Sequence, residues 1–253
     1  MQVEHLYRYP VKGLSAEALD QARLLPGRCI EHDRRFALVQ GDAPFDVEAP
    51  RFLPKQNFAC LMANEGLALI TSAFDAHDEV LLLRFPDQTI VREKISLPDG
   101  RERIAHALTK YLGSQARGTP FFTEAPGHAF TDQKRPGISL INLASLEALE
   151  KASGHRLDPL RFRANVYFTG APAWAEFDWV GQEIMLGSAR LSVFKRTVRC
   201  PATQVNLQTG ERDADVPQLL RQHFGHADLG VHAEIIEEGA VESGDALETL
   251  TRQ

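Results

Sequence analysis

The feature that most constrains the fold is a series of short apolar runs, each ended by proline, glycine or a polar cluster. Short runs rich in β-branched and aromatic residues predict strands, because such side chains suit a pleated, half-buried surface. We expect strands at residues 3–9, 35–40, 67–72, 79–84, 138–141, 165–169 and 190–195. Gly230 to Glu237 and the glycine-containing segment after it are expected to form a terminal hairpin. Many short strands separated by turns favour a barrel or a sandwich.

Three segments carry helix signals. Residues 101–112 place apolar side chains on one helical face and are followed by Gly113 as a stop. Asn142 can cap a helix that ends at Gly154, and Asp215 can cap a short helix that ends at Gly225. The stretch from 114 to 137 is rich in Gly, Pro and Thr and has little periodicity. We place a domain boundary there and expect domains at 1–115 and 116–253.

The charge balance and the cysteines limit the class of protein. A formal net charge of −6 gives no general argument for nucleic-acid binding, so affinity for an anion must come from a local cluster of Arg and Lys. The N-terminus lacks the apolar region of a signal peptide, and no apolar stretch has the length of a membrane helix. Three widely spaced cysteines do not suggest a disulfide framework. We therefore expect a cytoplasmic protein that binds neither nucleic acid nor membrane.

Cys200 is the most informative residue. It follows an expected strand within the sequence KRTVRCP, so several cations precede it and a proline ends regular structure after it. Neighbouring positive charge favours the thiolate, which is both a nucleophile and a soft metal ligand. Core packing is the alternative for Cys200, and spacing alone does not decide between the two. Cys29 and Cys60 lie in apolar settings, which favours core packing.

Other motifs of known chemistry are absent from the sequence. It contains no GxGxxG or Walker loop, no HExxH and no GxSxG. Basic residues instead recur at the ends of expected strands: Lys12, Arg34, Arg35, Arg161, Arg163 and Arg199. Arg and Lys bind phosphate groups. With a thiolate they describe a site for a ligand that contains both an anionic group and a soft metal.

These motifs together resemble the MOSC family of molybdenum enzymes and sulfur carriers. Arg199–Gly210 (RCPATQVNLQTG) is similar to the MOSC signature, and Arg161–Val166 is similar to its Phe-Arg-Pro-Asn strand. Further segments resemble the opening, middle and closing parts of the MOSC domain: 139–149, Trp179, 181–191 and 230–245. Residues 9–13 and 33–36 resemble the MOSC N-terminal β-barrel domain. The resemblance covers nearly the whole chain.

The resemblance implies a mixed, mainly β fold: two β-barrel-like domains with a few short helices and the molybdenum cofactor (molybdopterin) between them. The family's molybdenum ligand corresponds to Cys200, which would also be the catalytic residue. The cofactor contacts correspond to these residues: Lys12, Arg34, Arg163, Asn165, Val198 and Arg199. Family members of the two-domain kind reduce N-hydroxylated small molecules. Electrons would come from a separate donor, a ferredoxin- or cytochrome-like protein with its reductase.

Three positions depart from the family pattern, and two other functions remain open. Gly13 stands where Ser is common, Ala164 replaces a proline, and Asn206 replaces an aspartate. The chain could instead carry sulfur or the cofactor, with Cys200 as a persulfide site. It could also be a cysteine-dependent hydrolase or thiol transferase without metal. Bound molybdenum, metal-free sulfane sulfur, and thiol reactivity with neither would distinguish these three functions.

Overall fold

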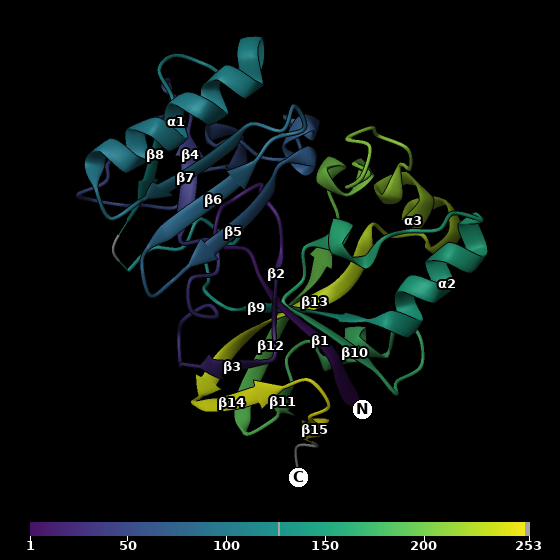
Figure 1. The fold of residues 1–253 in the computed structure, drawn as a ribbon. Coiled ribbons are helices and arrows are strands. Elements are labelled where there is room, and N and C mark those ends of the chain that lie inside the picture. Colours follow the sequence, from purple (N-terminus) through teal and green to yellow (C-terminus); the bar gives the residue numbers. More distant parts are fainter. Residues whose placement is uncertain (126, 251–253) are drawn as a thin grey trace.

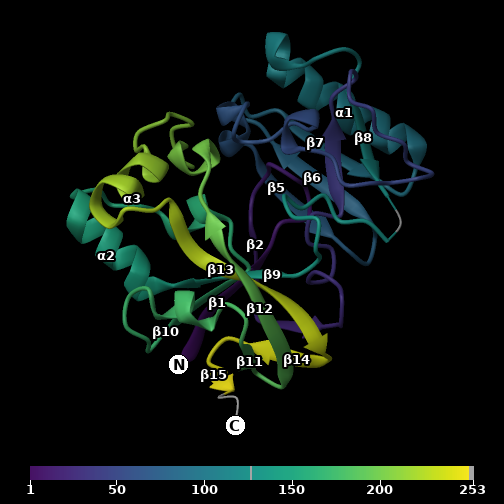
Figure 2. The same ribbon diagram turned by 180° about the vertical axis from the view of Figure 1, so that it is seen from behind.

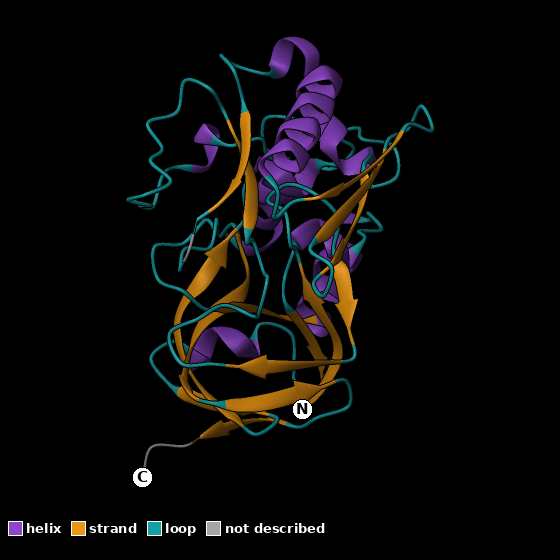
Figure 3. Cartoon of the chain, turned by 60° about the vertical axis from the view of Figure 1, so that its left-hand side comes forward, coloured by secondary structure: helices purple, strands orange, loops and turns teal. Residues whose placement is uncertain are grey.

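The computed structural model describes residues 1–125 and 127–250 and shows two lobes (Figure 1). The lower lobe contains an eight-stranded sheet with the order β15-β11-β12-β13-β9-β10-β1-β2. Its strands are β1 (Gln2–Arg8), β2 (Glu17–Leu19), β9 (Ile138–Asn142), β10 (Val166–Thr169), β11 (Glu183–Leu186), β12 (Ala189–Val198), β13 (Asp228–Glu237) and β15 (Leu247–Leu250). The sheet curls around a buried apolar core (Figure 3). The predicted mainly β fold with few helices is confirmed.

The long strands β12 and β13 pair antiparallel and lie side by side in the view from behind (Figure 2). β13 pairs antiparallel with β9, and β9 pairs parallel with β10. β10 then pairs with β1, which brings the N-terminal strand into this sheet. β3 (Gln21–Leu24) pairs with β14 (Gly239–Glu242) in a separate ribbon. The predicted domain boundary near residue 115 stays a prediction. Hydrogen-bonded strand pairs, such as β1 with β10 and β4 with β8, join segments on both sides of it.

The upper lobe has its own core between two small sheets and a helix (Figure 1). One sheet has the order β5-β6-β7: β5 (Thr71–Asp75), β6 (Val80–Arg84) and β7 (Ile90–Lys94). The other pairs β4 (Phe36–Val39) with β8 (Phe121–Glu124). Helix α1 (Pro98–Leu112) contributes a buried apolar stripe that includes Ile104 and Leu108, as the sequence predicts.

The two remaining helices confirm the capping predictions. In α2 (Leu143–Ser153), the Asn142 side chain accepts a hydrogen bond from the Ala144 backbone N–H, and Gly154 ends the helix at φ 72°. In α3 (Val216–Phe224), Asp215 is the cap and Gly225 ends the helix at φ 77°. Glycine is favoured at both ends because side chains with a Cβ rarely adopt positive φ. These helices flank the lower lobe (Figure 1).

Two expectations about local structure are wrong. Residues 65–69 form a 3-10 turn, and the strand in this region begins only at Thr71. The terminal hairpin does not form, because β13 pairs with β12 and β9 while β14 pairs with β3. In the second case, a distant pairing partner decides the structure and local pattern does not. No helix in the described part of the chain is long and apolar enough to cross a membrane.

Candidate functional site

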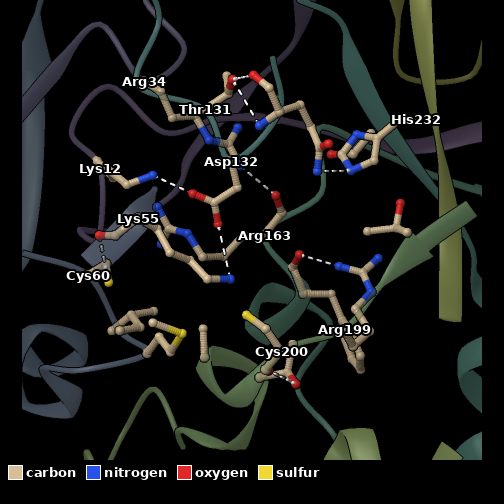
Figure 4. Close-up of a pocket in the computed structure, with 18 of the residues that line it drawn as sticks. Lys12, Arg34, Lys55, Cys60, Thr131, Asp132, Arg163, Arg199, Cys200 and His232 are labelled. Atoms are coloured by element: carbon tan, nitrogen blue, oxygen red, sulfur yellow. Dashed lines mark hydrogen bonds and ion pairs between the residues drawn. The ribbon is translucent and has the colours of Figure 1, made fainter. Parts of the chain in front are cut away.

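A pocket of about 230 Å³ lies where the two lobes meet. Its walls include residues from the upper lobe, from the ends of lower-lobe strands, and from the segment that links them. All seven residues that the sequence singled out as site residues line this pocket: Lys12, Arg34, Arg163, Asn165, Val198, Arg199 and Cys200. Figure 4 shows the thiol of Cys200 on one wall of the pocket, facing Lys55, Asp132 and Arg163.

Cys200 is fixed by the end of β12 and the turn that follows. It directly precedes a 3-10 turn, Pro201–Gln204, and its carbonyl accepts hydrogen bonds from the Thr203 backbone N–H (3.0 Å) and hydroxyl (2.9 Å). The Cys200 side chain is partly exposed, so core packing does not account for it. Cys60 is buried and Cys29 is half-buried, and all three cysteines are free. The core-packing prediction is thus met by Cys60, which also lines the pocket.

Arg212 joins the Cys200 turn to the upper lobe. Its guanidinium donates to the carbonyls of Pro201 and Met62, each at 2.9 Å, and pairs with Glu65 at 3.1 Å. Met62 lines the pocket from the upper lobe and Pro201 directly follows Cys200, so a single side chain joins these two segments. Sequence reasoning missed Arg212, because neither its neighbours nor its spacing distinguish it from a solvated arginine.

Lys12 and Lys55 approach one carboxylate. The Lys12 ammonium donates to Asp132 (2.5 Å) and to the Phe130 carbonyl (2.9 Å). The Lys55 ammonium lies 3.7 Å from the other carboxylate oxygen of Asp132, which Figure 4 shows between the two lysines. Burial lowers the pKa of Lys55, but the nearby Cys200 and Asp132 outweigh burial and raise it above its ordinary value. Lys55 is therefore a cation beside the Cys200 sulfur.

Neither Lys55 nor Asp132 was predicted as a site residue. Asp132 lies in the linking segment, which has no regular pattern, and Lys55 lies in a 3-10 turn, Lys55–Asn57. Lys12 is one of the predicted site residues, and the structure shows it in an ion pair with Asp132. Its charge is already offset by Asp132, so it is not a free cation in the pocket.

The side chain of Arg34 contacts the backbone of Arg163. Arg34 holds the buried carboxylate of Asp33 with bonds of 2.6 and 2.5 Å, and donates to the Arg163 carbonyl at 2.8 Å. Arg163 donates from Nη1 to the Leu14 carbonyl at 2.6 Å. Its Nη2 is shielded from solvent and has no hydrogen-bond partner among the described residues.

Arg199 and Asn165 hold the framework of the pocket. The buried Arg199 guanidinium donates to the carbonyls of Leu229 (Nε, 2.8 Å) and Phe162 (Nη1, 2.9 Å). Burial lowers the pKa of Arg199 to about 10, which leaves it charged at neutral pH. The Asn165 carbonyl oxygen accepts from the backbone N–H and the hydroxyl of Ser139, each at 3.1 Å. Val198 differs from both, because it is 69% exposed at the pocket rim.

The pocket carries an excess of positive charge in an acidic chain. Its lining has two carboxylates, those of Asp33 and Asp132. Seven basic side chains line it as well: Lys12, Arg34, Lys55, Arg135, Arg161, Arg163 and Arg199. Burial, with Arg199 and Lys195 nearby, lowers the pKa of His232 to about 3, so this imidazole is neutral. Such a lining favours an anionic ligand.

Unsatisfied polar atoms in the lining also indicate a ligand. Besides Arg163 Nη2, the buried Thr197 hydroxyl has no partner among the described residues. Buried polar groups are usually hydrogen-bonded, so these two atoms fit a polar ligand. Within the described ranges, no group of three or more His, Cys, Asp or Glu could hold a metal ion. A metal here would rely on Cys200 and on ligands that arrive with it.

Comparison with known proteins gives matches to two family models and to curated relatives. Residues 1–125 match the MOSC N-terminal beta barrel domain, and residues 127–248 match the MOSC domain. Molybdenum cofactor sulfurase from Bos taurus is 24% identical over 256 residues, and the one from Homo sapiens is 24% identical over 259 residues. Each alignment covers 87% of this chain but only 28% of the relative, so the chain spans little more than a quarter of those proteins.

Solved structures give weaker likenesses. The YuaD protein from Bacillus subtilis aligns with a TM-score of 0.49 at 17% identity, over 100% of this chain and 96% of that one. YiiM from Geobacillus stearothermophilus aligns with a TM-score of 0.36 at 21% identity, over 46% of this chain and 54% of that one.

Proposed function

Because the chain belongs to the MOSC family in its two-domain form, we propose that its pocket binds the molybdenum cofactor and that the protein reduces N-hydroxylated compounds. The observation that carries the proposal is the Cys200 thiol, partly exposed at the end of β12 within a pocket lined by basic residues from both lobes. A soft thiolate is a ligand that suits molybdenum, and basic side chains suit the anionic pterin phosphate.

The residues present fit this cofactor. Cys200 would supply the protein's metal ligand. Arg163 Nη2 and the Thr197 hydroxyl, both buried without partners among the described residues, would donate to anionic or carbonyl oxygens of the pterin. Lys12 and Arg34 would contact the anionic part of the cofactor. Asp132 and Asp33, with which they form ion pairs, already hold them in place. Arg199 and Asn165 would support the pocket wall through the bonds that they make to the backbone and to Ser139.

When bound, the cofactor supplies the redox chemistry, and the protein supplies binding and orientation. Reduction of an N-hydroxylated compound consumes two electrons and two protons and yields the corresponding N–H compound and water. Lys55 is a protonated side chain beside Cys200 and would orient the polar N–O group of the substrate. We propose that the electrons come from a separate ferredoxin- or cytochrome-like protein with its reductase, in the cytoplasm. The three free cysteines fit a reducing compartment.

A second candidate is a carrier of sulfur or of the cofactor, with Cys200 as a persulfide site. The similarity to molybdenum cofactor sulfurase favours it, since the alignment covers 87% of this chain. The alignment covers only 28% of that relative. What we propose for this chain is therefore the carrier role alone, without the activity of the whole sulfurase.

Reduction assays test the first candidate. The full chain, expressed with an intact cofactor pathway, is supplied with reduced methyl viologen and either benzamidoxime or hydroxylamine. We expect turnover by the wild type, almost none by Cys200→Ala, and wild-type rates for Cys29→Ala, whose thiol lies outside the pocket lining. Molybdenum-loaded protein without turnover of either compound would contradict the proposed reduction. Sulfane sulfur on Cys200 in metal-free protein would favour the carrier.

A further inference from the structure

The aromatic ring of Tyr9 contacts two of the three arginines that are expected to contact the cofactor, Arg34 and Arg163. The Arg34 and Arg163 guanidinium carbons each lie 4.3 Å from its centroid. Tyr9 is only 1% exposed, so these contacts are shielded from water. A guanidinium over an aromatic face gains more when the pair is desolvated. One ring therefore stabilises two buried cations at the same place.

Tyr9 is itself fixed to the backbone beside each arginine. Its backbone N–H donates to Asp33 (2.8 Å), the same carboxylate that Arg34 holds. Its carbonyl accepts from the Arg34 backbone N–H at 2.7 Å. Its hydroxyl donates to the carbonyl of Ala164, the neighbour of Arg163, at 3.1 Å. The position of this ring is thus tied to the two backbone segments that carry Arg34 and Arg163.

The two arginines need such support. Arg34 and Arg163 have φ angles of 51° and 53°, in the left-handed region that side chains with a Cβ rarely adopt. Strained backbone of this kind persists where the surrounding structure holds it, often at a binding site. Their positive charges also repel each other: burial and Arg34 lower the pKa of Arg163 to about 10. Among the described residues, Asp33 is bonded to Arg34 and not to Arg163, whose Nη2 has no partner there.

We propose that Tyr9 is a positioning residue, whose ring holds Arg34 and Arg163 together as a receptor for a phosphate-type anion that exists before the ligand binds. Only the identity of that ligand rests on the proposed function. A preformed receptor binds more tightly because ordering its groups costs nothing further at the moment of binding. The Nη2 of Arg163, which has no partner among the described residues, is then left as a donor for the ligand.

The test measures inorganic phosphate binding by titration calorimetry. The full chain is produced in a host that cannot make the cofactor. Tyr9→Phe keeps the ring and Tyr9→Met replaces it with a flexible side chain that has no aromatic face. We expect Phe to bind phosphate within twofold of the wild type and Met to bind at least tenfold more weakly. Arg163→Ala should weaken binding similarly, and adding Tyr9→Met to Arg163→Ala should weaken it by clearly less than tenfold, because only the contact of the ring with Arg34 is then left to lose.

The double variant separates positioning from a general structural role. If Tyr9→Met weakens binding as much in the Arg163→Ala background as in the wild type, Tyr9 does not act through Arg163 and the proposal is overturned. If Met binds within twofold of the wild type, or if Tyr9→Phe alone loses tenfold, the ring is not what positions the arginines. Absence of phosphate binding by the wild type would also overturn it. Should Tyr9→Met fail to fold, a tenfold loss in Tyr9→Phe would still overturn the proposal. Molybdenum content, measured separately, decides the proposed function.

Discussion

Replacing Asp213 by Asn should destabilise the protein by leaving a buried cation without its partner. Arg161 is 3% exposed and lines the pocket, and it holds both carboxylate oxygens of Asp213 at 2.5 and 2.8 Å. The hydrogen bonds from Arg161, with a further one from Asn206, lower the pKa of Asp213 to about 2. The pair joins the loop before β10 to the segment that follows Cys200, so its loss should also loosen one wall of the site.

The magnitude follows from two considerations. A pKa depressed by about 2 units is worth about 2.5 kcal/mol if fully expressed, but Asp213 is 37% exposed and solvent screening reduces this to about 1 kcal/mol. Leaving Arg161 buried and unpaired adds to the loss. We expect Asp213→Asn to lower the free energy of unfolding by about 2 kcal/mol at pH 7, a shift of roughly 0.7 M in urea midpoint at a slope of about 3 kcal/mol/M.

Urea titrations at several pH values check both the size and the sign. The folded-state pKa is lowered, so the stabilisation is complete above the unfolded-state pKa of about 3.9 and is lost as pH falls toward 2. The difference between wild type and Asp213→Asn should be constant from pH 5 to 8 and shrink below pH 4. Arg161→Met should cost less, because the carboxylate left behind reaches solvent. A larger loss for Arg161→Met, or a difference that grows at low pH, would refute the reasoning.

Three further predictions concern separate parts of the molecule. Asn142→Ala should lower the free energy of unfolding by about 3 kcal/mol in thermal denaturation, because α2 loses its side-chain cap and the Pro172 carbonyl and the buried Glu176 carboxylate lose a donor; an unchanged melting temperature would contradict this. Asp132→Asn should raise inorganic phosphate affinity severalfold at low salt and less at high salt, because it frees the charges of Lys12 and Lys55; weaker binding would show that Asp132 mainly positions the lysines. Arg212→Ala should speed hydrogen exchange in residues 61–65 and 201–204 while leaving β12 protected; unchanged exchange in both segments would exclude Arg212 as the link between them.

Local sequence signals predicted the features that depend on near neighbours. The caps of α2 and α3 were predicted because Asn142 and Asp215 act within one turn of their own positions, and their terminal glycines act within the same helix. The sequence also predicts residues that the structure places in one pocket. They lie at the ends of strands, where side chains from several elements meet.

Features set by distant contacts could not be predicted in this way. The terminal segment looks like a hairpin locally, but β14 pairs with β3, more than two hundred residues earlier. Lys55 and Asp132 carry no recognisable motif, and only the fold places them beside Cys200 and Lys12. Likewise, nothing adjacent to Tyr9 in the sequence shows that its ring contacts Arg163. The ion pairs that offset Lys12 and Arg34 are visible only in three dimensions.

The central claim is that Cys200 anchors a molybdenum cofactor in this pocket. The most direct measurement is molybdenum and pterin content of the full chain, expressed with an intact cofactor pathway, in wild type, Cys200→Ala and the control Cys29→Ala. We predict near-stoichiometric molybdenum in the wild type and in Cys29→Ala, and little in Cys200→Ala, because the soft metal ligand is lost. Full molybdenum occupancy in Cys200→Ala, or no molybdenum in any of the three proteins, would contradict the account.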